Sequence, residues 1–194
     1  MINRCSWVGD NPQMREYHDK EWGTPIHDDR LLFEFLNLEG AQAGLNWTTI
    51  LRKRENYRKA FNDFDAQKIV NYNEKIIEEL LNNEGIIRNR RKIEAVISNA
   101  KAFLKVKKEY GSFDKYIWKF VGHKQIINNF KDLSELPSKT EISEQMSKDL
   151  KKRGFKFVGP TICYAFMQAV GMVNDHVIDC FRYEEINQKV KKKH

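Results

Sequence analysis

Two soft metal ligands, His176 and Cys180, stand four residues apart near the end of the chain. That spacing would place an imidazole and a thiol on one face of a helix, where they form half of a zinc site. Cys5 and His18, in the aromatic-rich N-terminal segment, could complete it. One Cys–His pair is not specific, but all four would staple this segment to the C-terminal part of the chain. Four protein ligands leave no open position, so the sequence predicts one structural zinc ion.

A second chemical feature is the glycine-rich, basic stretch at about 150–161, which predicts a hairpin between two helices. Gly154 suits the left-handed position that ends a helix, and Pro160 suits the first position of the next helix. Cys163 falls on the apolar face of that second helix and is expected in the core. Such a hairpin directs free backbone N–H groups at an anion. The expected contacts to phosphate are Lys151, Lys152, Gly154, Lys156, Gly159 and Thr161.

Glu39 is the polar residue that stands out, because it lies in an apolar context between Leu38 and two glycines. A carboxylate there either caps a helix end or faces a ligand. Tyr17, Trp22 and Trp47 supply aromatic planes. A carboxylate beside such planes matches a planar cation, since the rings stack and the charges pair. The alternative is that all three aromatic residues belong to the core.

Composition limits the classes of partner. The 194 residues carry a net charge of +7, which favours a polyanion such as nucleic acid. Hydrophobic residues make up 41% of the chain, so a packed globule is expected rather than disorder. We find no apolar run long enough for a membrane span and no signal peptide. An odd count of three cysteines favours a metal or free thiols over disulfides. We therefore expect a cytoplasmic protein, with a monomer as the default.

Helices must position these side chains, because apolar residues recur at three- and four-residue spacing along most of the chain. The longest such stretch runs over residues 89–108. Helix starts are predicted where a short polar side chain can accept a backbone hydrogen bond, at Asp28, Asn46, Asp65, Asn73, Asn89 and Ser112. No alternating strand interrupts the pattern. We expect an all-α fold in which residues 1–183 form one unit.

Three segments are expected to depart from this helical pattern. Residues 1–27 show little periodicity and are expected to be irregular. Gly40 and Gly44 are expected to bracket a turn that leaves space beside Glu39. Residues 184–194 are highly charged and are expected to form a basic, flexible tail.

Taken together, these stretches resemble the bacterial 3-methyladenine DNA glycosylase I family, within the helix-hairpin-helix glycosylase superfamily. The resemblance covers residues 4 to about 181, in order. The matching stretches are RCSWVGDNP, YHDKEWGTP, LEGAQAGLNWTTILRKRENYRKAF, GIIRNRRKIEAVISNA, LKKRGFKFVGPTICYAFMQAVG and NDHVIDC. Matches of this length are far more specific than a lone hairpin.

The resemblance implies a monofunctional enzyme that cuts the N-glycosidic bond of N3-methyladenine in alkylated double-stranded DNA and leaves an abasic site. Glu39 falls on the family's pocket carboxylate, and Tyr17 and Trp47 fall on its aromatic walls, with Trp22 nearby. Met14 stands where related sequences often have another pocket tyrosine. The resemblance also implies zinc ligation by Cys5, His18, His176 and Cys180.

Two other classes of function remain. A non-catalytic DNA-damage binding module would use the same hairpin with an inactive pocket, and Met14 is the feature that favours it. A zinc hydrolase such as a nucleobase deaminase needs an open zinc position and an H-x-E…P-C-x-x-C pattern, which this sequence lacks. Asp175 lies where many relatives in the superfamily place an activating aspartate, but we assign it no catalytic role.

Overall fold

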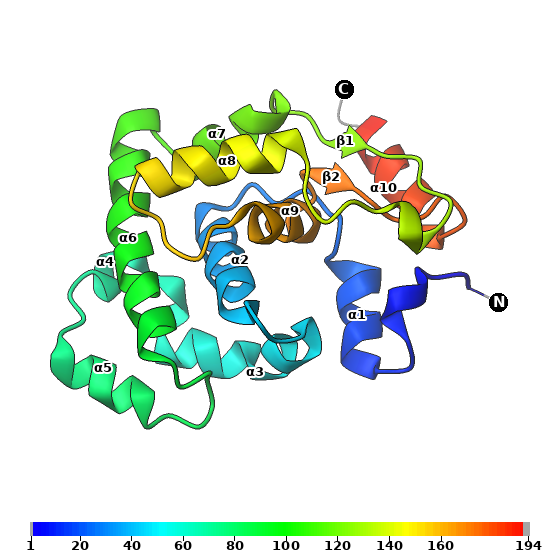
Figure 1. The fold of residues 1–194 in the computed structure, drawn as a ribbon. Helices are drawn as coiled ribbons and strands as arrows, with labels where there is room; N and C mark the ends of the chain where they lie inside the picture. The colour runs from blue at the N-terminus through cyan, green and yellow to red at the C-terminus, as the bar shows by residue number, and fades with distance from the viewer. Residues whose placement is uncertain (1, 192–194) are drawn as a thin grey trace.

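Ten α-helices make up most of residues 2–191, the part of the chain that the computed structural model describes (Figure 1). They are α1 (Pro12–Lys20), α2 (Asp29–Gln42), α3 (Trp47–Ala60), α4 (Ala66–Ile69), α5 (Glu74–Leu81), α6 (Arg90–Tyr110), α7 (Phe113–Trp118), α8 (Glu141–Lys152), α9 (Pro160–Ala169) and α10 (Phe181–Lys191). The prediction of a mostly helical fold is confirmed. Along the described helices, none is both long and apolar enough to cross a membrane.

The predicted helix starts are confirmed by their capping bonds. The side chains of Asp28, Asn46, Asp65, Asn73, Asn89 and Ser112 each accept a hydrogen bond from a backbone N–H in the first turn that follows. Thr140 caps α8 and forms a reciprocal capping box with Ser143. These local bonds explain why the helices begin where short polar residues precede an apolar run.

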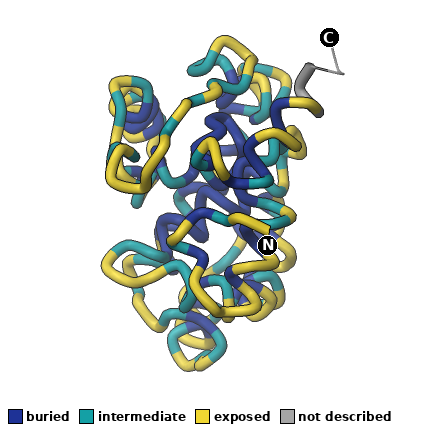
Figure 2. The backbone as a smooth tube through the Cα atoms, turned by 90° about the vertical axis from the view of Figure 1, so that its right-hand side faces the viewer, coloured by how far each residue is buried: buried dark blue, intermediate teal, exposed yellow. Residues whose placement is uncertain are grey.

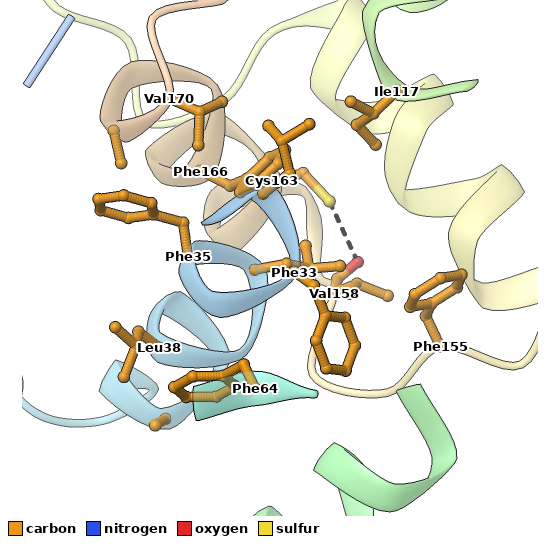
Figure 3. Packing of buried hydrophobic residues seen from close by; sticks show 14 of the residues in the cluster. Phe33, Phe35, Leu38, Phe64, Ile117, Phe155, Val158, Cys163, Phe166 and Val170 are labelled. Carbon is orange, nitrogen blue, oxygen red and sulfur yellow. Dashed lines mark hydrogen bonds between the residues drawn. The ribbon is translucent and has the colours of Figure 1, made fainter. Parts of the chain in front are cut away.

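Helix α2 lies at the centre of the hydrophobic core. Its residues from Leu32 to Ala41 are all buried, and the buried backbone runs through the middle of the molecule while exposed segments lie outside (Figure 2). Figure 3 shows Phe33, Val158 and Cys163 close together in this core, with the Cys163 thiol bonded to the Val158 carbonyl oxygen at 3.5 Å. Cys163 is therefore a core residue, as predicted.

The turn between α8 and α9 has the local backbone features predicted for Gly154 and Pro160. Gly154 adopts a φ of +95°, in the left-handed region that favours glycine. Phe155 and Val158 are buried beneath the turn, and Pro160 is the first residue of α9. Phe157 also has a positive φ, +52°, which is uncommon for a residue with a side chain. The hairpin is thus held in a specific conformation by its apolar side.

Two predictions for the first part of the chain are wrong, namely the irregular segment 1–27 and the turn that begins at Gly40. The segment 1–27 contains α1, whose cap Asn11 accepts hydrogen bonds from the N–H groups of Gln13 and Met14 and is followed directly by a proline. Gly40 does not begin a turn, because α2 continues through it to Gln42. The turn lies around Gly44, which has a φ of +77°. Gly40 instead packs against Phe157.

The expected strandless fold and flexible tail also need correction. Strands β1 (Ile126–Ile127) and β2 (Val173–Asn174) form a short parallel pair. Helix α10 runs through the segment expected to be a tail, and Ile186 and Asn187 are buried in it. Only residues 192–194 of that segment lie outside the described residues. Burial against distant parts of the chain overrides the charged composition here.

Candidate functional site: a buried ligand cluster and an aromatic pocket

Four buried side chains, two thiols and two imidazoles, converge from the two ends of the chain. The potential ligand atoms of Cys5, His18, His176 and Cys180 all lie within 4.8 Å of one another. The Cys180 Sγ lies 3.4 Å from His18 Nε2 and 3.5 Å from His176 Nδ1. The Cys5 Sγ lies 3.5 Å from His176 Nδ1. The structure therefore brings the predicted set together, and the set could hold one metal ion.

The outer nitrogen of each imidazole has a partner that leaves the inner nitrogen free to bind a metal. His18 Nδ1 lies 2.8 Å from Asp19 Oδ1, and Arg4 in turn binds both carboxylate oxygens of Asp19. His176 Nε2 lies 3.0 Å from the carbonyl oxygen of Trp22. The partners fix the orientation of both rings, which is typical of metal-ligating histidines.

His176 and Cys180 do not share a helix, contrary to the prediction. They lie in a turn between β2 and α10, in which the Cys180 N–H donates to the Val177 carbonyl oxygen at 2.8 Å. A further bond, from the Phe181 N–H to the Asn3 carbonyl oxygen at 3.1 Å, joins this turn to the N-terminal segment. Figure 1 shows α1 and α10 on the same side of the molecule. The predicted stapling of the two segments follows from the turn rather than from a helix.

A pocket of about 230 Å³ lies beside this cluster. Its walls include every predicted base-binding residue together with the predicted carboxylate: Met14, Tyr17, Trp22, Trp47 and Glu39. The Tyr17 and Trp47 rings lie 5.3 Å apart between centroids, tilted by 45°. The indole N–H of Trp47 is buried and has no hydrogen-bond partner among the described residues. The pocket is therefore apolar and aromatic, with few polar groups.

Glu39 is the one ionisable carboxyl group among the described residues that line this pocket. It is 4% exposed, and burial alone raises the pKa of its carboxyl group from 4.5 to about 8. No described residue offsets that shift by a charge or a hydrogen bond. Burial, followed by the charge of Glu39, also raises the pKa of Tyr17, whose hydroxyl therefore keeps its proton. A cation entering the pocket would pair with the ionised carboxylate and so favour release of this proton.

The raised pKa predicts a pH-dependent cost of Glu39 to folding. Above pH 4.5 the unfolded chain releases the Glu39 proton while the folded chain keeps it, so stability falls as the pH rises toward 8. We expect the melting temperature of Glu39→Gln to exceed that of the wild type increasingly between pH 5 and pH 8, relative to their difference near pH 4.5. A difference that stays constant over this range would show that the pKa is not raised.

One buried guanidinium links three of the helices that line the pocket. Arg54 of α3 donates through Nε to Glu34 Oε1 of α2 at 2.6 Å, and through Nη1 to Glu21 Oε2 at 2.6 Å. Glu21 is the C-terminal cap of α1. Since Tyr17, Glu39 and Trp47 stand on α1, α2 and α3, this node fixes their mutual positions.

Several pocket residues were missed by the sequence reasoning. Trp7, Gln42, Ala165 and Gln168 line the pocket, as do Leu133 and Leu136. Leu133 is 40% exposed, in a 3₁₀ turn of the polar link before α8. Gln42 and Gln168 carried a weak signal, because polar residues on otherwise apolar helices deserve inspection. The two leucines carried no signal, since the link around them shows no periodicity.

The hairpin lysines that are predicted to contact phosphate have no acidic partner among the described residues. Lys151, Lys152 and Lys156 are exposed and form no ion pair with a described residue. Arg153 differs, because it pairs with Asp149 and Glu109. A Cβ atom at Gly159 would meet nothing within 4 Å, so the start of α9 is open.

A pocket for one planar ring, next to a basic hairpin with an open helix N-terminus, is the arrangement expected of a helical enzyme that acts on a base taken out of its stack. The family model of methyladenine glycosylases matches residues 7–183. The chain is 52% identical to the DNA-3-methyladenine glycosylase of Haemophilus influenzae over 93% of this chain and 97% of that protein. The chain belongs to the methyladenine glycosylase family, and it is a hydrolase of N-glycosyl bonds.

Solved structures agree with this assignment. A crystal structure of a 3-methyladenine DNA glycosylase I superposes with a TM-score of 0.91 at 51% identity, covering 92% of this chain and 98% of the other. A variant of a 3-methyladenine DNA glycosylase I, solved in complex with 3-methyladenine, superposes with a TM-score of 0.90 at 37% identity, covering 93% and 97% of the two chains. The fold of this chain is thus the fold of that family.

Proposed function

We propose that this chain removes N3-methyladenine from alkylated double-stranded DNA by hydrolysing its N-glycosidic bond, which leaves an abasic site. The observation that supports this most strongly is the buried, unpaired carboxylate of Glu39 in an aromatic pocket. A methylated adenine is a flat cation, so it stacks on Tyr17 and Trp47 and pairs with Glu39. The direct test is release of the free base from methylated DNA.

The chemistry needs little catalytic power, because the cationic base is already a good leaving group. Flipping the nucleotide out of the duplex costs roughly a few kcal/mol, and the pocket recovers that cost through stacking and the ion pair. Neutral adenine gains no ion pair and leaves Glu39 protonated and unpaired, so it is held less well. Water then attacks the oxocarbenium-like sugar as the base departs. Selection is accordingly the main task of Glu39, Tyr17, Trp47, Trp22 and Met14.

Asp175 is poorly placed to activate water, and we assign it no catalytic role. It is buried, and it accepts hydrogen bonds from the Asn128 amide, the Tyr164 hydroxyl and the Gln168 amide, at 2.7, 2.6 and 2.8 Å. A carboxylate that accepts these three hydrogen bonds holds Asn128, Tyr164 and Gln168 in place.

Zinc is the metal that best suits the buried Cys–His set. Bond lengths of ~2.3 Å to sulfur and ~2.05 Å to nitrogen place tetrahedral S and N ligands about 3.6 Å apart, close to the S···N distances of 3.4 and 3.5 Å here. Cys5, His18, His176 and Cys180 would supply all four ligands, and the ion would be structural. The closed ligand set argues against the deaminase alternative.

DNA would be held by the helix-hairpin-helix turn, through backbone N–H groups at the start of α9 and the nearby lysines. We expect Lys156→Ala to weaken DNA binding several-fold at low salt and less at high salt, because the lysine acts through counterion release. Gly159→Ala should weaken binding at all salt concentrations, since its methyl group would occupy the open side where a phosphate approaches. Fluorescence anisotropy with a labelled duplex measures both effects. Unchanged affinity in both variants would refute the hairpin assignment.

The remaining alternative is a non-catalytic binding module, which would bind damaged DNA tightly and release no base. The family assignment favours the enzyme. We further propose that the chain folds as one unit of the helix-hairpin-helix superfamily, which extends past the predicted boundary at residue 183 because α10 packs against it. We also propose that the protein acts as a monomer and that it works in the cytoplasm.

A further inference from the structure

A buried asparagine of α6 holds the backbone of the hairpin through both the N–H and the carbonyl group of one residue. Asn99 is 2% exposed. Its Oδ1 accepts from the Lys156 N–H at 2.7 Å, and its Nδ2 donates to the Lys156 carbonyl oxygen at 3.2 Å. The same Nδ2 also donates to Asn37 Oδ1 of α2 at 2.9 Å. One side chain therefore connects the hairpin, α6 and α2.

This connection reaches α2 beside the pocket carboxylate. Asn37 precedes Glu39 by two residues, and Gly40 follows Glu39 directly. Gly40 lies against the hairpin so closely that a Cβ atom there would come 3.1 Å from the Cβ of Phe157 and 3.3 Å from its carbonyl oxygen. The segment of α2 that carries Glu39 thus packs against the hairpin at Gly40 and is joined to it through Asn99 at Asn37.

A second α6 side chain fixes the end of the same segment. Lys92 lies two turns before Asn99 along α6, and its Nζ donates to the carbonyl oxygens of Ala41 and Ala43 at 2.8 and 2.7 Å. Burial lowers the pKa of this ammonium group. Helix α6 therefore holds both the C-terminal end of α2 and the hairpin from one face.

We propose that Asn99 is a positioning residue that sets the distance between the phosphate held by the hairpin and the base pocket at Glu39. The inference rests on the proposed function, because it concerns the geometry in which a flipped nucleotide spans the two sites. A flipped base reaches the pocket only when its own backbone is held at the correct place. Displacements of about 1 Å can cost roughly 100-fold in rate. The positive φ of Phe157 shows that the hairpin needs such external support.

Asn99→Leu tests the proposal, because leucine keeps the approximate volume and removes all three hydrogen bonds. Val106→Ala is the matched control, since Val106 is also buried on α6 but contacts neither the hairpin nor the pocket through a polar group. Three quantities are measured for each variant: the melting temperature, the affinity for a duplex with an abasic-site analogue, and the affinity for free 3-methyladenine.

We expect Asn99→Leu to weaken duplex binding at least tenfold while its affinity for the free base stays within twofold of wild type. Val106→Ala should lower the melting temperature and leave both affinities unchanged. The proposal is overturned if Asn99→Leu binds the duplex like wild type, or if duplex and free-base affinities fall together in proportion to stability.

Two further measurements keep the test decisive. If Asn99→Leu shows no cooperative melting, Gly40→Ala replaces it, because its methyl group displaces the hairpin from α2 without removing a hydrogen bond, and the same split in affinities is expected. Base release by the wild-type protein is measured alongside. Absence of release would refute the proposed function, whereas the duplex affinities would still decide whether Asn99 positions the hairpin.

Discussion

Replacing Glu39 by glutamine should lower the rate of 3-methyladenine excision by about 100-fold or more, while affinity for undamaged duplex DNA stays within twofold of wild type. The amide keeps the shape of the side chain but cannot pair with a cationic base, and removal of one such preorganised electrostatic contact typically costs this much. Single-turnover excision from methylated DNA measures the rate. The Glu39 side chain lines the pocket and forms no hydrogen bond or ion pair with the hairpin, so we expect DNA binding to be separable from excision.

Glu34→Gln is the matched control for this substitution. Glu34 is also a buried carboxylate on α2, but it is paired with Arg54 and Arg58. Its loss leaves buried charge unpaired and should lower stability, with a smaller effect on excision by the folded fraction. Glu39→Gln should show the reverse, with stability kept or increased at pH 8 and excision lost. Excision by Glu39→Gln at the wild-type rate would remove Glu39 from the proposed mechanism.

Loss of a metal ligand should have the largest effect on stability. We expect the purified protein to contain one zinc ion per chain, and Cys180→Ala to lose it with a fall in melting temperature of about 10 °C or more. The site joins the two ends of the chain, so its binding free energy is part of the folding free energy, and each kcal/mol lost shifts the melting temperature of a chain of this size by roughly 2–4 °C.

Cys163→Ala is the control for the metal prediction, because Cys163 is a buried cysteine outside the ligand cluster. It should keep the zinc and show a smaller fall in melting temperature, due to lost packing alone. Elemental analysis and calorimetry measure both properties. Preparations without stoichiometric zinc, together with unchanged stability of Cys5→Ala, would show that the four side chains do not bind a structural metal.

Features that depend on neighbouring residues were predictable from the sequence. The caps at Asn46 and Asn89 and the left-handed turn at Gly154 follow from local hydrogen bonds and backbone sterics. Such signals need only a few residues to be read. The Cys–His cluster was predictable because potential soft ligands at both ends of the chain solve one structural problem, and the structure brings those side chains together.

Features that depend on distant contacts were not predictable in this way. Helix α1 was overlooked because its aromatic residues face the pocket and the cluster, which hides the helical spacing of apolar positions. Gly40 was assigned to a turn because its contact with Phe157 involves a segment more than a hundred residues away. Asn99 carried no signal at all, since a polar residue on a helix is usually exposed, and only the fold shows that it holds the hairpin.

Release of free base from methylated DNA tests the central proposal most directly. The purified protein is incubated with methylated duplex, and the free bases are identified by chromatography. We expect free 3-methyladenine from the wild type, abasic sites left in the DNA, and release reduced to near background in Glu39→Gln. DNA binding without release of any base, in protein that holds its zinc, would contradict the proposed function and support the non-catalytic binding module.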